Sequence, residues 1–298
     1  MRWERCRKMT LDYISKWGER ISLSNNEDFW LTNVDGLTWA GTDIASVIIG
    51  GVDGDSINNC QAQPRGIIMD FRIKTGVNVE DAKRNILKTI KLKQQGTLEW
   101  SQNNKILTIK GLVESVDFPR FNNAVTMQIA LHCSQPFWED IKEILTEISE
   151  YKNLHYFTET AGDMLYFVEE GMPFGEYDTS RTRTFVNAGD VAVGMQIEVI
   201  ALSTVTNPII YDQDGNFFGA GYGVGSKQII MNAGDRLIIN TTIGNKYIEL
   251  NGVSQLDKVR PHSKWLQLEA GVNEFSINSD DQEVNNMIFT MSYKQRYI

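Results

Sequence analysis

Residues 185–191 read Phe-Val-Asn-Ala-Gly-Asp-Val, residues 230–237 read Ile-Met-Asn-Ala-Gly-Asp-Arg-Leu, and residues 268–275 read Leu-Glu-Ala-Gly-Val-Asn-Glu-Phe. In each stretch an apolar run enters an Ala-Gly corner and a second apolar run leaves it. Glycine supplies the positive φ that a tight strand-turn-strand corner needs. Three such corners in one half of the chain predict a β-sandwich.

Further turn signals punctuate the same half of the chain at Asp214-Gly215, Gly244-Asn245 and Asn251-Gly252. They separate short apolar runs at the even spacing that is typical of a jelly roll or a related two-sheet fold. We therefore expect almost pure β structure after residue 153.

The first half of the chain mixes strands with one convincing helix. Residues 66–73, 105–110 and 124–131 are rich in β-branched residues and alternate between apolar and polar positions, which predicts half-buried strands. Such a mixture favours a β-sandwich or barrel that carries a single α-helix.

The helix is predicted from Val79 to Lys93, with Asn78 as its N-cap. One apolar face recurs at three- and four-residue steps, formed by Val79, Ala82, Ile86 and Ile90. Lys88, Lys91 and Lys93 complement the carboxyl end of the helix dipole. These lysines have two readings, a solvated helix end or a basic surface that binds an acidic partner.

A second amphipathic segment begins at Pro136. Helical spacing relates its apolar residues Phe137, Ile141, Ile144, Leu145 and Ile148. We expect a connecting helix here, although a strand with the same apolar residues is the alternative. The domain boundary is expected in this region, which gives an amino-terminal domain at 1–148 and a carboxyl-terminal domain at 149–298.

Charge separates the two halves of the 298-residue chain. The net charge is −9, from 29 Lys and Arg against 38 Asp and Glu. Residues 1–150 hold 20 acids and 18 bases, and residues 151–298 hold 18 acids and 11 bases, so their net charges are −2 and −7. An acidic excess argues against a protein that grips nucleic-acid phosphates.

Cysteine usage and hydropathy indicate where the chain is made. Cys6, Cys60 and Cys133 are too few and too odd in number for a disulfide framework. No run of eighteen apolar residues and no apolar signal core occurs, so we expect synthesis in the cytoplasm without membrane insertion.

Residue patterns for catalysis or metal binding are weak. The three histidines are His132, His155 and His262, and no Gly-x-Ser-x-Gly motif accompanies them. His132 and Cys133 are neighbours on a predicted strand and therefore point to opposite faces. We predict no catalytic, cofactor-binding or metal-binding residue, and no enzyme.

Several acidic clusters imitate functional sites. Asp212, Asp214 and Asn216 resemble the start of a calcium loop, but its sixth position is not glycine and its twelfth is not glutamate, so we expect a β-turn. The pairs Glu169-Glu170 and Asp280-Asp281 are sequence neighbours whose side chains diverge on an extended chain. They therefore do not form the acid and base of a glycosidase.

Trp265 is the candidate glycan contact of the chain. In Ser263-Lys264-Trp265-Leu266-Gln267-Leu268 its ring fits a sugar-stacking platform on a β-sandwich. The same alternation also fits a strand whose aromatic ring faces the core between two sheets.

A series of short motifs in a fixed order extends over most of the chain from about residue 30. In the second half they are Asn187-Ala188-Gly189-Asp190, Gly194-Met195-Gln196-Ile197, Thr206-Asn207-Pro208-Ile209, Gly234-Asp235-Arg236-Leu237 and Trp265-Leu266-Gln267-Leu268-Glu269-Ala270-Gly271-Val272-Asn273. In the first half they are Gly54-Asp55-Ser56, the capped helix, Gly96-Thr97-Leu98, Ile109-Lys110-Gly111-Leu112-Val113-Glu114 and Leu131-His132-Cys133-Ser134-Gln135-Pro136-Phe137-Trp138. Together they resemble the distal tail proteins of the phage tail family.

This resemblance implies a structural role and a mainly β fold. Family members form a hexameric ring at the end of the tail tube through an amino-terminal domain that encircles the channel. A galectin-like or jelly-roll β-sandwich at the carboxyl end projects outward. The ring connects the tube to the tip hub or baseplate and often anchors receptor-binding proteins.

The implied partners are therefore copies of the chain, the tail tube protein, the tip or hub protein, and receptor-binding or baseplate proteins. Genomic DNA is expected to pass through the channel without specific binding, helped by acidic residues in the lumen. The implied location is the tail tip or baseplate of the virion, assembled from protein made in the host cytoplasm. The tail type stays open among long non-contractile tails, contractile tails and tail-like bacteriocins.

Two other functions compete with this one. The carboxyl-terminal sandwich is a candidate glycan-binding module that contacts the host surface through Trp265. A glycan-degrading enzyme is disfavoured because no acid pair suits it.

Overall fold

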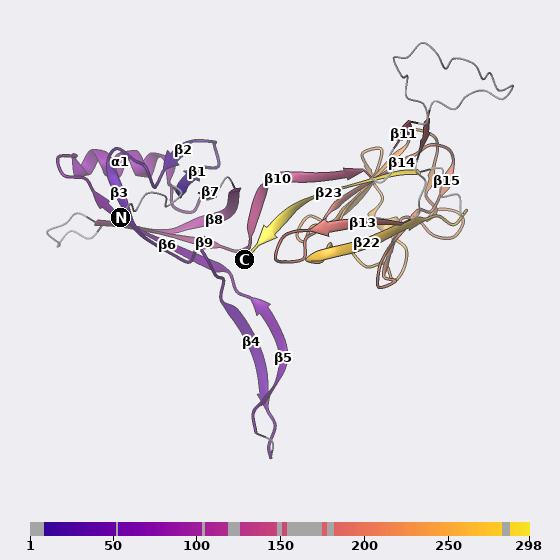
Figure 1. Cartoon of the computed structure of the whole chain (residues 1–298), viewed down its shortest axis with the longest axis horizontal. Coiled ribbons are helices and arrows are strands. Elements are labelled where there is room, and N and C mark those ends of the chain that lie inside the picture. The colour runs from indigo at the N-terminus through magenta and orange to yellow at the C-terminus, as the bar shows by residue number, and fades with distance from the viewer. Residues whose placement is uncertain are drawn as a thin grey trace, which may run out of the picture. The chain divides into compact units, whose positions relative to one another are not determined.

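The computed structural model describes residues 9–51, 53–102, 105–118, 126–147, 151–153, 175–177, 182–281 and 287–298. Two compact units divide the chain, Met1–Lys142 with Arg296–Ile298, and Glu143–Gln295 (Figure 1). The unit boundary falls inside two strands, β10 (Trp138–Glu147) and β23 (Met287–Tyr297). The described residues are mainly β with one α-helix, as predicted.

Seven antiparallel strands form the sheet of the amino-terminal unit, in the order β2–β1–β7–β8–β9–β6–β3. Their bounds are β1 Thr10–Ile14, β2 Arg20–Ser22, β3 Phe29–Asp35, β6 Arg65–Ile73, β7 Gln95–Gln102, β8 Lys105–Asp117 and β9 Thr126–Cys133. Among the described residues β2 and β3 are the two edges and do not pair with each other, so the sheet stays open. The closed barrel that the sequence also allowed for this unit therefore does not form in the described part of the chain.

Alternate residues of these strands are buried, so one face of the sheet covers a single core. Along β6 every second residue is buried, and Ile67, Met69 and Phe71 are completely inaccessible to solvent. Apolar residues from β1, β7, β8 and β9 join them in the same cluster. The strands predicted at 66–73, 105–110 and 124–131 are confirmed as β6, β8 and β9, although residues 124 and 125 lie outside the described part.

Helix α1 (Val79–Thr89) begins where the N-cap signal placed it. The Asn78 side chain accepts a hydrogen bond from the backbone N–H of Glu80 at 3.0 Å. Ala82 and Ile86 on the apolar face are completely buried. The helix ends four residues earlier than Lys93, because Ile90 is the C-cap residue and Lys93 takes a left-handed φ of 62°.

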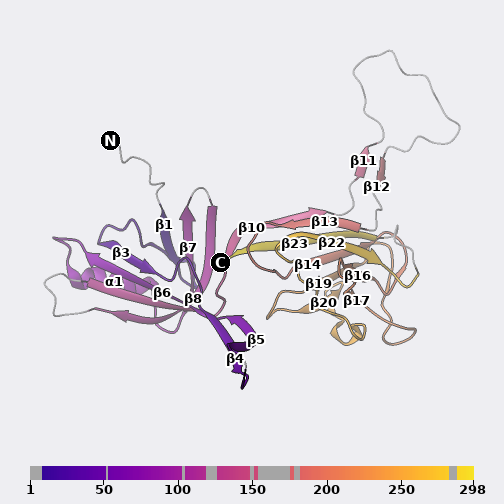
Figure 2. The same cartoon turned by 60° about the horizontal axis from the view of Figure 1, so that its bottom comes forward.

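A long two-stranded hairpin extends beyond the rest of this unit (Figures 1 and 2). It consists of β4 (Thr42–Ile48) and β5 (Asp55–Ala62), which pair only with each other within the described part of the chain. A register shift between Ala45 and Ser46 adds a bulge, which bends the hairpin.

The helix predicted from Pro136 is wrong, because residues 138–147 form the strand β10. Glu139 and Asp140 pair with β8, and Trp138 is completely buried. Ile141 and Leu145, which helical spacing placed on a buried face, are 47% and 66% exposed. Pairing with a distant strand therefore overrides the local helical pattern.

The carboxyl-terminal unit is a two-sheet β-sandwich, as predicted (Figure 2). One sheet has the order β23–β14–β19–β20–β21 and the other β13–β22–β16–β17, and buried residues of both form a single core. The bounds are β13 Thr182–Asn187, β14 Gln196–Ala201, β16 Ile209–Asp212, β17 Phe217–Gly219, β19 Arg236–Asn240, β20 Tyr247–Leu250, β21 Val253–Ser254 and β22 Gly271–Asn278. Smaller elements are β11 Tyr151–Asn153, β12 Gly175–Tyr177, β15 Val205–Thr206, β18 Ile230–Met231 and a 3-10 turn at Leu256–Lys258.

The predicted corners lie at strand ends, and two of them use a left-handed glycine. Gly234 and Gly271 have φ values of 89° and 98°. At the first corner the Asn187 side chain holds the turn, because it accepts from Gly189 N and donates to the Val191 carbonyl, both at 3.0 Å.

Candidate interaction surfaces

The titratable residues that the sequence singled out are scattered. His132 is exposed and Cys133 is buried on the opposite face of β9, as predicted. His262 lies in an exposed turn with a φ of 66°. His155, Cys6 and the Glu169-Glu170 pair lie outside the described residues.

Asp280 has a structural contact instead of a catalytic one. Its carboxylate accepts from the Arg260 guanidinium at 2.6 Å and from the Asn207 amide at 2.8 Å. Within the described residues no group of three or more His, Cys, Asp or Glu is placed to hold a metal ion. In the same part of the chain, no helix is long and apolar enough to cross a membrane.

The calcium-loop imitation is a hairpin turn between β16 and β17. Asp212 Oδ1 accepts hydrogen bonds from the backbone N–H groups of Asp214 at 3.0 Å and Asn216 at 2.8 Å. Gly215 completes the turn with a φ of 77°. Since these bonds occupy the Asp212 carboxylate, the cluster is explained as the turn that the sequence predicted.

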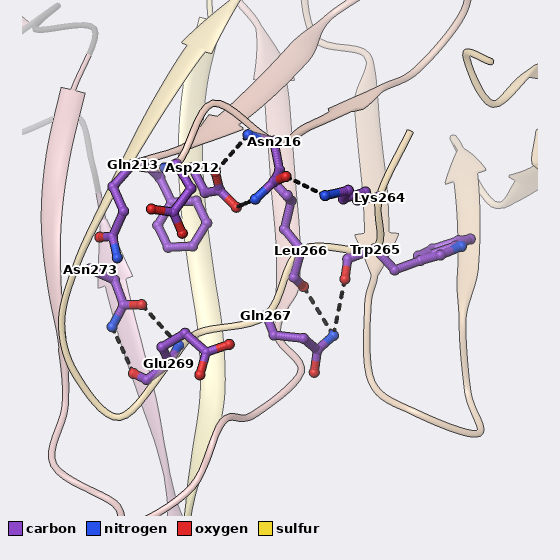
Figure 3. A pocket seen from close by; sticks show the side chains of 11 residues that line it. Asp212, Gln213, Asn216, Lys264, Trp265, Leu266, Gln267, Glu269 and Asn273 are labelled. Carbon is purple, nitrogen blue, oxygen red and sulfur yellow. Dashed lines mark hydrogen bonds between the residues drawn. The ribbon is translucent and has the colours of Figure 1, made fainter. Parts of the chain in front are cut away.

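Trp265 lies beside a pocket of about 170 Å³ in the carboxyl-terminal sandwich. Its indole points away from the other side chains drawn in Figure 3, and its carbonyl accepts from Gln267 Nε2 at 3.3 Å. The indole packs on Phe218, with ring centroids 4.8 Å apart, and Lys246 Nζ lies 5.6 Å from its centroid. The ring is therefore half-buried against the core, with part of its surface accessible.

The pocket itself is lined by polar side chains over an apolar floor. Gln213, Glu269 and Asn273 lie around it, and Phe275 belongs to the buried core (Figure 3). Asn273 bonds both the N–H and the carbonyl of Glu269, at 2.9 and 2.8 Å. The polar atoms of Asn273 therefore hold the turn between Glu269 and Asn273 together.

Exposed apolar side chains gather on the β4–β5 hairpin. Every residue of its two strands is exposed. Directly opposed residues of a hairpin share a face, and alternate residues change face. The register puts three opposed pairs on one face, Ile44 with Cys60, Ser46 with Ile57, and Ile48 with Asp55.

This face, called the apolar hairpin face below, consists of Ile44, Ile48, Ile57 and Cys60. The three isoleucines are 55%, 82% and 63% exposed. Isolated two-stranded hairpins are marginally stable in water, and contiguous exposed apolar groups mark interaction sites. The sequence analysis missed this surface, although the Gly50-Gly51 pair after an Ile-rich run is a hairpin signal.

Buried Arg65 fixes the root of this hairpin. It is 1% exposed and begins β6, directly after β5. Its Nε donates to the Pro136 carbonyl at 2.7 Å, and Nη1 donates to the carbonyls of Leu37 at 2.6 Å and Gly36 at 3.1 Å. Trp138 Nε1 also donates to the Leu37 carbonyl, at 2.9 Å. One guanidinium therefore joins the segment that enters the hairpin to the strand that leaves it.

Burial around this cluster perturbs two titratable groups. It lowers the pKa of Arg65, which still stays protonated, and it raises the pKa of the Cys133 thiol to about 11. The Arg65 charge acts on Cys133 in the opposite direction but is the smaller effect. Cys133 is therefore a neutral thiol in the core, whereas Cys60 is exposed on the hairpin.

Comparisons with known proteins agree with this architecture. Residues 188–297 match the family model described as siphovirus-type tail component, C-terminal domain. The crystal structure of SPP1 Dit (gp 19.1), described as a paradigm of the hub adsorption apparatus in phages that infect Gram-positive bacteria, is similar over 98% of this chain and 100% of that one. Its TM-score is 0.66 and its sequence identity 14%. A chain of the phage p2 baseplate in its activated conformation with Sr matches over 98% of this chain and 100% of that one, with 11% identity and a TM-score of 0.46. No curated protein sequence matches the chain.

Proposed function

We propose that this chain is a structural component of a phage tail or tail-like particle that assembles into a hexameric ring, because residues 188–297 match the model of a siphovirus-type tail component. The ring connects the tail tube to the tip hub and the host-recognition apparatus. Residues 1–148 build the ring, and residues 149–298 form the outward sandwich.

The β4–β5 hairpin is the observation that carries this proposal. A monomer gains nothing by holding Ile44, Ile48 and Ile57 in water, since burial of one such side chain is worth about 1.5–3 kcal/mol. In the proposed ring the hairpin contacts a different patch on the next copy. Contacts of that heterologous kind close into rings when the rotation allows it.

Residues 1–150, which contain the proposed ring domain, have a net charge of −2 and therefore no basic excess that would hold DNA passing through such a ring. Acidic groups in the lumen repel phosphates and keep the duplex from binding to the wall. This part of the proposal fails if the residues that line the channel of an assembled ring are mainly Lys and Arg.

Hairpin variants test the assembly directly. Ile48→Asn combined with Ile57→Asn removes most of the apolar hairpin face without touching the core, so the monomer should fold as before. We expect light scattering after gel filtration to report a ring for the wild type and a monomer for this variant. Val272→Asn, at a residue 66% exposed on the other unit, is the matched control and should assemble normally.

Wild-type chain that stays monomeric at micromolar concentration in physiological salt contradicts the proposal. Normal rings of the double variant contradict the role of the hairpin alone.

Glycan binding by the carboxyl-terminal sandwich is the second candidate function, and the accessible part of the Trp265 ring favours it. Stacking of a sugar on this indole predicts retained glycans on an array, and their loss in Trp265→Ala. Because the indole also packs on Phe218, circular dichroism must first establish that this variant folds. Trp17→Ala, at a residue 66% exposed in the other unit, is the control that should retain glycan. Absence of any retained sugar removes this candidate.

A further inference from the structure

Helix α1 exposes a basic stripe on the side opposite to its buried face. Arg84, Leu87 and Lys88 are exposed on the helix, and the exposed Lys91 follows just beyond its end. The three helical positions are three or four residues apart or adjacent, so they form a continuous stripe. Leu87, 42% exposed, is the apolar residue of this basic stripe.

The bases of the stripe lack acidic side-chain partners in the part of the chain that the structure describes. Residues 82–98 contain five bases and no acid. Lys83 pairs with Glu80 at 3.1 Å, whereas Arg84, Lys88 and Lys91 have no ion-pair partner within the described part of the chain. These bases complement the helix dipole, and because no carboxylate of the described residues pairs with them they also suit an acidic partner surface.

The hairpin carries the complementary charge. No Lys or Arg occurs between Arg20 and Arg65, and the hairpin with its flanks, residues 41–63, holds Asp43, Asp53 and Asp55. Asp55 shares the apolar hairpin face, opposite Ile48. That face therefore combines exposed isoleucines with an acidic end, while the basic stripe combines an exposed leucine with bases.

The dimensions of the two surfaces are also compatible. An 11-residue helix is about 16 Å long at 1.5 Å per residue. An 8-residue strand spans about 26 Å at 3.3 Å per residue. The hairpin is thus long enough to lie across the whole helix and to bring its acidic end beyond one terminus.

From this complementarity we propose that the β4–β5 hairpin of one copy packs its apolar face across the basic stripe of α1 on the next copy. The occupant of both surfaces is a second copy of this chain. Ile44, Ile48 and Ile57 cover Leu87, and Asp55 pairs with a base of the stripe. This inference rests on the proposed ring, and it identifies the two surfaces that join neighbouring copies in it.

The native Cys60 provides a direct test, because it lies on the apolar hairpin face. In Leu87→Cys, mild oxidation should join Cys60 of one copy to residue 87 of the next and give a ladder of covalent oligomers up to the ring. The ladder should disappear in Cys60→Ser combined with Leu87→Cys. Glu114→Cys, at an exposed residue of β8, is the position control and should give no ladder.

Charge reversal gives an independent readout. Arg84→Glu with Lys88→Glu should raise the concentration needed for assembly at least about two- to fivefold, in line with one lost ion pair of about 0.5–1 kcal/mol. Adding Asp55→Lys, the acid on the apolar hairpin face, to that variant should restore assembly. High salt should weaken the wild-type ring in the same direction.

The outcomes separate this contact from the ring itself. Rings that assemble without a Cys60–residue 87 cross-link, and without rescue by the compensating reversal, overturn the hairpin-on-helix contact and leave the ring standing. Wild-type chain that never assembles overturns the proposed function and the contact together.

Discussion

At the residue scale, Arg65 is a buried charged side chain that holds three separate backbone carbonyls. Its guanidinium donates to three backbone carbonyls, and burial excludes water as a substitute acceptor partner. Removal of one partner from a buried charged network costs the desolvation of the groups left behind. The geometry of the hairpin root therefore depends on this residue.

We predict that Arg65→Met lowers the free energy of unfolding by about 3 kcal/mol, since charged hydrogen bonds are worth about 1.5–3 kcal/mol each and methionine recovers part of the packing. Urea unfolding followed by tryptophan fluorescence measures it. Arg72→Met, at an exposed position of the same strand, is the control and should change stability by less than about 0.5 kcal/mol. Equal effects of the two substitutions would contradict the role assigned to Arg65.

Cys133 gives a prediction about alkaline pH. Burial raises the pKa of its thiol from 9.0 to about 11 in the folded chain. The unfolded chain therefore ionises first, and the stability that is fully present below pH 9 falls as the pH rises towards 11. We expect unfolding free energies of wild type to fall more steeply over this range than those of Cys133→Ala.

The exposed Cys60 is the control for that experiment. Cys60→Ala removes a thiol with no burial to lose, so it should keep the steep decline of the wild type. Parallel pH profiles for wild type and Cys133→Ala would show that the buried thiol does not contribute.

Some of these residues are visible in the sequence and others are not. Asn78 is recognisable as a cap because its partner is two residues away. Arg65 is not recognisable, because its acceptors lie 28 to 71 residues away and only the folded chain brings them together. From the local sequence, an arginine at the start of an alternating strand is expected to be exposed to solvent.

At the element scale, the N-cap of α1 is the simplest contact to test. Asn78→Ala removes the bond to Glu80 N and should lower the free energy of unfolding by about 1 kcal/mol. Asn78→Asp retains an acceptor next to the helix dipole and should lose little. Thermal unfolding of the three chains measures the difference, and an unchanged melting temperature in Asn78→Ala would contradict the cap assignment.

Elements were predictable where local pattern and tertiary context agree. Strands β6, β8 and β9 alternate because one face packs on the core, and α1 shows the 3.6-residue period for the same reason. In strand β10 the local pattern and the tertiary context conflict. Its apolar spacing fits a helix, but pairing with β8 and burial of Trp138 make it a strand.

The hairpin was not predictable as a surface. Its strands alternate like other strands, but no local signal tells that neither face is covered in the monomer. The relevant partner is absent from a single chain, and the sequence pattern of a covered face and of a docking face is the same. Exposure of Ile48 at 82% is information that only the folded structure provides.

At the scale of the whole molecule, the two halves of the sequence differ in composition as the two units differ in fold. The Ala-Gly corners predicted the carboxyl-terminal sandwich because they mark strand ends, and the motif order indicated the family that residues 188–297 match. An interface between copies depends on a second chain, so the proposed ring interface could not be predicted from the sequence pattern of one chain. In the proposed ring, the hairpin with its acidic end and the basic helix form this interface.

The central claim is that this chain closes into a ring, and negative-stain microscopy of the purified protein tests it most directly. We predict ring-shaped particles with six-fold symmetry in class averages and an open central channel, which disappear when Ile48 and Ile57 are both replaced by asparagine. Images that contain only single elongated or compact chains, at concentrations where light scattering also reports a monomer, would contradict the claim.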